Sequence, residues 1–169
     1  MPGACAGKPK MKWGGCKMRI RGFEKINKYK DVVFPMPVRK TKTSAGYDIC
    51  VPEDVALLPG RMVMVPTGVK AYMQEDEFLG VHIRSSMAIK KGIRLVNNVG
   101  IIDADYYNNP DNEGHIMLAL VNTGLEPMVL KKGERVAQGI FYKYLTTDDD
   151  KETEKENRSG GFGSTGKNR

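Results

Sequence analysis

Two aspartates separated by one residue are the clearest candidates for chemistry in this chain of 169 residues. Asp103 and Asp105 lie in the stretch NNVGIIDADYYNNP at 97–110, with Gly100 before them and Tyr106 after them. Residues two apart on a β-strand point to the same face, so on a strand the two carboxylates share a face. Such a pair can bind a metal ion, serve as a general base or cap a turn, and the spacing leaves these roles open.

A guanidinium and two hydroxyls form a second candidate group. Arg84, Ser85 and Ser86 lie in the stretch IRSSMAIKKGI at 83–93, at the start of a brief helical pattern around SSMAIKK. An arginine beside hydroxyls at a helix start suits phosphate oxygens. The alternative is a structural role, in which Ser85 or Ser86 caps the helix, and the pattern favours neither interpretation.

A polar residue inside an apolar strand is the third candidate. In KKGERVAQGIF at 131–141, Arg135 and Gln138 interrupt an otherwise apolar run. A buried amide must find a hydrogen-bond partner, which could be backbone or a ligand.

The elements that must position these side chains are predicted to be strands. Short runs rich in β-branched and aromatic residues, separated by turn signals, extend from Met18 to Leu145. They are MRIRGFEKI, DVVFPMPV, YDICV, VALL, RMVMVPTGVKAYM, FLGVHIRS, GHIMLALVN, PMVL and RVAQGIFYKYL. This pattern predicts an all-β sandwich, jelly roll or barrel. It contains no βαβ unit and no glycine-rich nucleotide loop, which excludes Rossmann and P-loop enzymes.

Charge and composition narrow the class further. The formal net charge is +7, but residues 1–30 carry nine basic and one acidic residue, so the rest of the chain has a net charge of −1. A near-neutral body argues against a nucleic-acid-binding module. Residues 1–17 are rich in Gly and Lys without periodicity, and we expect a disordered leader there. No apolar run is long enough to span a membrane or to act as a signal peptide, so we expect a cytoplasmic protein without a membrane partner.

The remaining metal-binding residue types favour structural roles. Cys5, Cys16 and Cys50 are odd in number and widely spaced, which disfavours a disulfide framework or a zinc site. We expect Cys50, in an apolar run, to be a small core residue. His82 and His115 have no second ligand at metal spacing, and a structural role is favoured for each.

After Leu145 the composition changes. Residues 146–157 are wholly polar, with six carboxylates. They cannot bury enough apolar area to offset the entropy of ordering, so we expect an acidic tether.

Five short motifs occur in one order along the chain: AGYDI at 45–49, RSS at 84–86, NNVGIIDADY at 97–106, GERVAQGIF at 133–141 and GGFGSTG at 160–166. In this order they resemble the motifs of the trimeric deoxyuridine triphosphatases, the dUTP diphosphatases. The third and fifth motifs are the most specific. The resemblance implies a jelly-roll domain at 18–145, followed by the tether at 146–157 and a lid motif at 158–169.

The resemblance also implies an activity and an assembly. Members of the family are homotrimers whose active sites lie at subunit interfaces. They hydrolyse dUTP to dUMP and pyrophosphate, with Mg²⁺ on the triphosphate, which keeps uracil out of DNA and supplies dUMP for thymidylate synthesis. No direct protein ligand is expected for the Mg²⁺, which the substrate phosphates would hold, and Asp48 would contribute through water.

Roles for single residues follow from the same resemblance. Asp103 is expected to be the catalytic base, which takes a proton from a water attacking the α-phosphorus in line. Tyr106 would pack under the deoxyribose and exclude a 2′-hydroxyl. The uracil and nucleoside contacts would come from Asn97, Gly100, Ile101, Ile102 and Met117. The phosphate contacts would come from Arg84, Ser85, Ser86 and Gln138, supported by Asp48 and Arg135.

The lid would be formed by Arg158, Phe162, Gly163 and Ser164. Phe162 offers a stacking face for uracil, and its flanking glycines let the backbone approach the ligand. Two departures from the family pattern concern this lid and a loop. The usual lid arginine lies five residues before the phenylalanine, where this chain has Asn157, and Arg158 lies four before. The loop YNNPDNEG at 107–114 is longer than usual, with Asn108 at a glycine position, where we expect Asn to accept a left-handed backbone.

Two other interpretations stay open on the sequence alone. One is an enzyme resembling the dCTP deaminases, which share the fold and some motifs; the lid motif and Asp103 favour hydrolysis instead. The other is a β-trimer that binds dUTP to regulate partners, a role that could coexist with catalysis.

Overall fold

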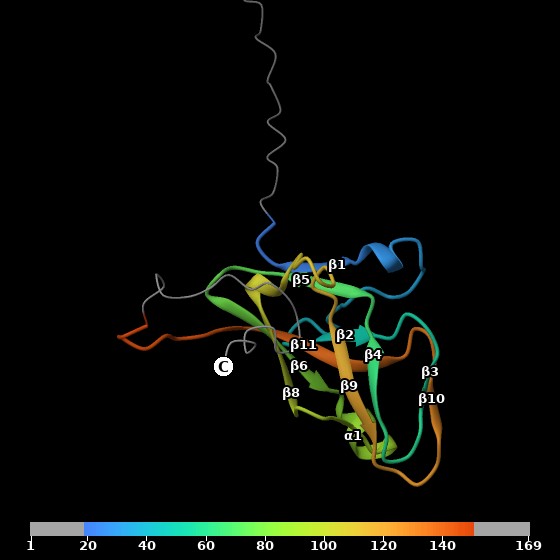
Figure 1. Cartoon of the computed structure of the whole chain (residues 1–169). Coiled ribbons are helices and arrows are strands. Elements are labelled where there is room, and N and C mark those ends of the chain that lie inside the picture. The colour runs from blue at the N-terminus through green and yellow to red at the C-terminus, as the bar shows by residue number, and fades with distance from the viewer. Residues whose placement is uncertain (1–18, 151–169) are drawn as a thin grey trace, which may run out of the picture.

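The computed structural model describes residues 19–150 and consists mostly of short strands (Figure 1). The strands are β1 (Gly22–Lys25), β2 (Tyr47–Cys50), β3 (Val55–Leu57), β4 (Met62–Pro66), β5 (Val69–Tyr72), β6 (Glu77–Ile83), β7 (Ile93–Leu95), β8 (Val99–Asp103), β9 (Met117–Asn122), β10 (Met128–Leu130) and β11 (Arg135–Lys143). One α-helix, α1 (Ser85–Lys91), and two 3₁₀ turns, η1 (Asn27–Tyr29) and η2 (Ala104–Tyr106), complete the described part. The predicted all-β class is confirmed.

The strands form four small antiparallel sheets. The largest has the order β2-β11-β6-β8, and a three-stranded sheet has the order β4-β9-β7. The pairs β1-β5 and β3-β10 complete the set. In Figure 1 the β1-β5 pair lies at one end of the molecule and α1 at the opposite end.

The core lies between these sheets. Ile49, Leu79 and Ala137, from three strands of the largest sheet, are completely buried, as are Val65 and Leu120 from the β4-β9 pair. Burial of such side chains, at roughly 25 cal/mol per Å² of apolar surface, is the main term that stabilises a fold without long helices. The other face of the β2-β11-β6-β8 sheet, called the outer face below, carries the polar candidates.

A β-bulge in β11 determines which side chains reach the outer face. Arg135 pairs with Cys50 and Gln138 pairs with Asp48, with a register shift between Arg135 and Ala137. Regular alternation would turn residues three apart to opposite faces. The extra residue of the bulge instead places Arg135 and Gln138 on the same face, next to Asp48.

The structure confirms one predicted element, corrects another and adds a strand that was not predicted. The helix occupies the predicted SSMAIKK segment. The predicted strand DVVFPMPV at 31–38 is wrong, because only Val38 makes a β-bridge there. Pro35 and Pro37 lack the N–H that a ladder requires. The three-residue β7 was not predicted, and its length explains why.

No helix among the described residues is long and apolar enough to cross a membrane.

Candidate functional site

The outer face of the largest sheet has a polar end around Asp48. Gln138 lies opposite both Asp48 on β2 and His82 on β6, so the three side chains form one row across the sheet. Val38 bridges to Asp48 and extends the row by one position. Arg135 joins the same end through the bulge.

Asp48 holds two arginines at this end. Its Oδ1 lies 3.0 Å from Nε of Arg84, and its Oδ2 accepts a hydrogen bond of 2.8 Å from Nη1 of Arg135. Arg84 also donates from Nη1 to the carbonyl oxygen of Arg135, at 3.4 Å. A guanidinium has five N–H donors, so Arg84 keeps donors for a further anion. The cluster therefore joins the ends of three strands and retains unused positive charge.

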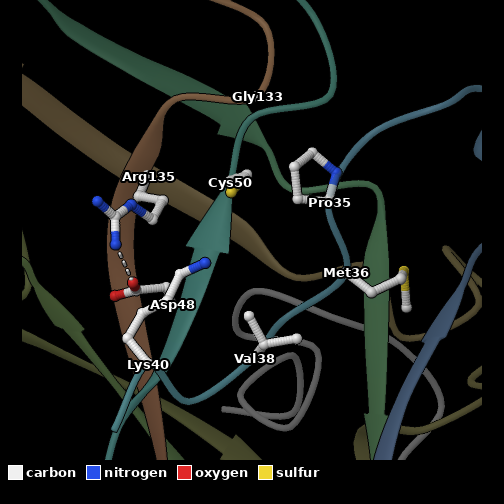
Figure 2. Close-up of a pocket in the computed structure, with 8 residues that line it drawn as sticks. All are labelled: Pro35, Met36, Val38, Lys40, Asp48, Cys50, Gly133 and Arg135. Carbon is white, nitrogen blue, oxygen red and sulfur yellow. Dashed lines mark hydrogen bonds and ion pairs between the residues drawn. The ribbon is translucent and has the colours of Figure 1, made fainter.

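A cavity of about 440 Å³ lies beside this cluster (Figure 2). Figure 2 shows the Asp48–Arg135 pair on one side and Pro35, Met36 and Val38 facing it across the cavity. Lys40 adds a second positive charge to the lining. Its floor includes Cys50, which is buried as expected and whose pKa is raised by that burial. The cavity combines an apolar wall with a charged wall.

The serines of α1 do not cap the helix. The N-cap residue is Arg84, in extended conformation, and it makes no side-chain capping hydrogen bond. Ser85 and Ser86 are thus the first two residues of the helix, and the capping interpretation is wrong. Their hydroxyls lie next to Arg84, at the polar end of the sheet.

The side chain of Gln138 packs against Gly46. Within residues 19–150 its amide makes no hydrogen bond. A Cβ on Gly46 would lie 2.5 Å from Oε1 of Gln138, so only glycine leaves space for this amide. This explains the glycine of the AGYDI motif, whose role the sequence did not reveal.

The opposite end of the same sheet carries the nucleoside candidates. A narrow cavity of about 40 Å³ opens between β8 and β9. Its lining includes Asn97, Gly100, Ile102 and Met117, four of the five residues expected to contact the nucleoside. The side chain of Ile101, the fifth, points to the outer face and is 54% exposed.

Asp103 ends β8 and is half-buried, opposite Phe78 on the outer face. The expectation that Asp105 shares its face is wrong, because η2 begins at Ala104 and turns Asp105 away from the strand direction. Asp103 occupies the N-cap position of η2, yet its side chain makes no capping hydrogen bond. The capping interpretation of this carboxylate therefore loses its support.

Tyr106 follows Asp103 in η2 and is buried. Its hydroxyl donates to the carbonyl oxygen of His115 at 3.2 Å and accepts from Nδ2 of Asn112 at 2.8 Å. The ring of His115 accepts from the backbone N–H of Gly68 at its Nε2, 3.0 Å away, and burial lowers the His115 pKa to about 4. His115 is thus a neutral structural residue, as expected.

The two ends are far apart within one chain. Asp48 and Asp103 are separated by three strand spacings and by four residues along β8. Strands lie about 4.8 Å apart and rise about 3.3 Å per residue, which gives a separation of about 20 Å. The two groups therefore lie at opposite corners of the sheet within one chain.

The lid candidates Arg158, Phe162, Gly163 and Ser164 lie outside the described residues, as do the expected leader at 1–17 and most of the tether. Within the described part, sequence reasoning missed Lys40, although the basic run VRKTK at 38–42 was a visible signal. It also missed Asn112, which no pattern in the loop distinguishes from the neighbouring asparagines.

Comparison with known proteins identifies the family that this chain matches. The family model for dUTPase matches residues 33–166 of the chain. The deoxyuridine 5′-triphosphate nucleotidohydrolase of Lactococcus lactis subsp. lactis is 54% identical over 149 residues, which cover 88% of this chain and 99% of that protein.

Solved structures agree. The crystal structure of dUTPase from Streptococcus mutans matches with a TM-score of 0.71 and 49% identity, covering 75% of this chain and 98% of that chain. A mutant dUTPase from phage phi11 of S. aureus, whose structure reveals the coordination of a structural Mg(II) ion, is 20% identical. It matches with a TM-score of 0.65 over 82% of this chain and 99% of that chain, and shares the fold.

Proposed function

Because the chain belongs to the dUTPase family and is a dUTP-hydrolysing enzyme, we propose that Asp103 is its catalytic base and that each active site combines residues of neighbouring chains. The products are dUMP and pyrophosphate. The observation that carries the proposal is the division of the candidate residues between two ends of one sheet, about 20 Å apart.

Asp103 performs the proton transfer. A water attacks the α-phosphorus in line, a new P–O bond forms, and the bond to the β-phosphate oxygen breaks as pyrophosphate leaves. The water proton passes to the Asp103 carboxylate. Its position at the end of β8, directly after Ile102 of the narrow cavity, supports this role. A carboxylate of ordinary basicity is sufficient, because phosphoryl transfer depends chiefly on positioning and electrostatics.

Uracil occupies the cavity between β8 and β9, and Tyr106 lies under the deoxyribose. The narrow cavity lined by Gly100 and Ile102 supports the exclusion of the 5-methyl group of thymine. Backbone groups of Gly100–Ile102 and the Asn97 side chain read the uracil edge. Discrimination of this kind is strong, since a wrong base leaves polar groups unpaired.

The phosphates bind at the polar end of a neighbouring chain. Gln138, whose amide has no hydrogen bond within the described residues, and Arg84, which keeps N–H donors, supply two contacts. Ser85 and Ser86 supply hydroxyls from the start of α1. Asp48 and Arg135 hold Arg84 in place. Preorganised donors of this kind stabilise the charge that develops on the leaving pyrophosphate.

The dUTPase family uses metal ions, and the donor set of this chain fits Mg²⁺ bound mainly to substrate. The described residues contain no cluster of three or more metal-ligating side chains. Both oxygens of Asp48 already accept from arginines, but each carboxylate oxygen has a second lone pair for a metal-bound water. When bound, Mg²⁺ neutralises phosphate charge; Asp48 orients its water shell.

The assembly is a homotrimer that buries the outer face of the β2-β11-β6-β8 sheet. Between the two ends this face carries Phe78, Val99, Ile101, Ile140 and Tyr142. Ile101 is 54% and Tyr142 is 38% exposed in the single chain. Contact between such faces would remove this apolar surface from water and bring the polar end of one chain toward Asp103 of the next. We place the reaction in the cytoplasm.

Pyrophosphate release from dUTP, dTTP, dCTP and UTP tests the function. Wild type should act on dUTP far faster than on the other three nucleotides, and Asp103→Asn should lower kcat by about 1,000-fold, within the range of a lost general base. Binding of a non-hydrolysable dUTP analogue should remain. Equal turnover of the two proteins would refute the role of Asp103, and deamination of dCTP would assign the chain to the deaminase class.

A further inference from the structure

The loop 107–114, which is longer than the family pattern, is a folded structure built on asparagine amides. Asn109 is 5% exposed, and its four hydrogen bonds all stay within or beside the loop. Its Oδ1 accepts from the backbone N–H groups of Asp111 and Asn112, at 3.0 and 3.1 Å. Its Nδ2 donates to the Tyr106 carbonyl oxygen at 2.9 Å and to Oδ1 of Asn112 at 2.8 Å.

The backbone of the loop closes on Tyr106. Asn108 and Glu113 have positive φ angles of 56° and 61°, which confirms the left-handed backbone expected at Asn108. Asn108 N–H donates to the Glu113 carbonyl oxygen at 3.1 Å. A Cβ on Gly114 would lie 2.5 Å from the Tyr106 carbonyl oxygen. The loop therefore packs directly against the residue that precedes it.

The hydrogen-bond directions at Asn112 are fixed by its neighbours. Its Oδ1 accepts from the N–H of Gly114 at 3.0 Å and from Nδ2 of Asn109. Its Nδ2 must then face the Tyr106 hydroxyl, which accepts this bond and donates its own proton to the His115 carbonyl oxygen. Donors and acceptors alternate along the whole chain of bonds, an arrangement in which each bond polarises the next.

We propose that Asn112 is a positioning residue that sets the selectivity for deoxyribose by holding the Tyr106 ring. The inference rests on the proposed role of Tyr106 under the sugar. A 2′-hydroxyl is excluded only if the surface below the sugar does not yield. Two bonds at the Tyr106 hydroxyl and two to its backbone carbonyl oxygen fix the phenol and the backbone that carries it before substrate arrives. Loss of the Asn112 amide removes the donor of the 2.8 Å bond to that hydroxyl.

The test is the ratio of kcat/KM for dUTP to kcat/KM for UTP. Asn112→Ala should lower this ratio about tenfold, mainly because UTP turnover rises, while kcat for dUTP changes by less than about threefold. Asn108→Gly is the matched control: it keeps a left-handed backbone, loses the bond to Lys70 and does not contact the Tyr106 side chain. Its ratio should equal that of wild type.

A double-mutant cycle with Tyr106→Phe separates positioning from general loosening of the loop. If Asn112 acts through the phenol, the double variant Tyr106→Phe/Asn112→Ala should have the ratio of Tyr106→Phe alone. Independent, additive effects would overturn the proposal, as would a wild-type ratio in Asn112→Ala. If Asn112→Ala does not fold, Asn112→Ser, which keeps an acceptor near Gly114 but cannot reach the phenol, takes its place.

Tyr106→Ala distinguishes failure of this proposal from failure of the proposed function. A wild-type ratio in Tyr106→Ala would remove Tyr106 from sugar selection altogether. A lowered ratio in Tyr106→Ala with an unchanged ratio in Asn112→Ala would overturn the role of Asn112 alone.

Discussion

The polar end and the nucleoside end of the largest sheet are built from different interactions. The polar end is held by charge: one carboxylate, Asp48, pairs with two arginines from neighbouring strands. The nucleoside end is held by neutral hydrogen bonds, from Asn109 through Asn112 to Tyr106. The difference matches the ligand proposed for each end. A triphosphate needs compensating charge, whereas a sugar and a base need a surface of fixed shape.

Among changes at the polar end, Gln138→Glu should have the largest effect, because it places a negative charge where phosphates are proposed to bind. We expect kcat/KM for dUTP to fall about 100-fold, equivalent to about 2.7 kcal/mol of transition-state stabilisation. Gln74→Glu, at an exposed position outside the row, should remain within about threefold of wild type. Steady-state kinetics measure kcat/KM for both variants. Similar values of kcat/KM would mean that Gln138 does not face the phosphates.

Mixed trimers test whether the two ends serve different sites of one assembly. Asp103→Asn and Gln138→Glu chains carry different tags, and doubly tagged trimers are isolated. If each site takes its base from one chain and its phosphate contacts from the next, one site in three is intact, so about a third of the wild-type rate returns. That is roughly 30-fold above the Gln138→Glu parent.

The control for this mixture pairs Asp103→Asn with Asp103→Ala, which leaves every site without a base and should restore nothing. A mixture of Asp103→Asn and Gln138→Glu that stays at parental activity would show that the two ends act within one chain.

Asp48→Asn should destabilise the polar end by leaving Arg84 and Arg135 close together without their carboxylate. We expect the free energy of unfolding to fall by about 2 kcal/mol, less than for a fully buried pair because the arginines are partly exposed. Urea unfolding at one fixed chain concentration measures it. Asp54→Asn, which breaks an exposed pair with Lys131, should leave the midpoint nearly unchanged. An equal fall in the free energy of unfolding in both variants would contradict the role of Asp48 in holding the two arginines.

The stability of the nucleoside end should depend on pH through His115. Its pKa is about 4 in the folded chain, chiefly through burial and then through repulsion from Lys28, against 6.5 when exposed. The unfolded chain therefore binds more protons between these values, and stability that is fully present above pH 6.5 is lost as pH falls to 4.

The loss should be on the order of 1–2 kcal/mol, after allowance for partial contact of the ring with solvent. His115→Gln should remove this part of the pH dependence, measured as the difference in unfolding free energy between pH 7 and pH 5. An unchanged difference in the variant would assign the effect to other groups.

The sequence predicted the fold class, the helix and most strands, because alternation and turn residues are local properties. The roles assigned to the residues at both ends through the order of the motifs stay predictions. The sequence prediction failed for 31–38, where prolines outweighed β-branched residues, and for Asp105, which a 3₁₀ turn removes from the strand. It could not show that Arg135 and Gln138 share a face, since a bulge is visible only through the pairing with β2.

The loop at 107–114 has a consequence for the handling of the protein by proteases. Exposed surface loops are the usual sites of cleavage, because a protease must draw several residues into an extended conformation. Here that extension would break the bonds of Asn109 and the backbone bond between Asn108 and Glu113 together. We therefore expect the loop to resist proteases despite its length, and an intact chain across this segment to preserve the surface proposed to hold the sugar.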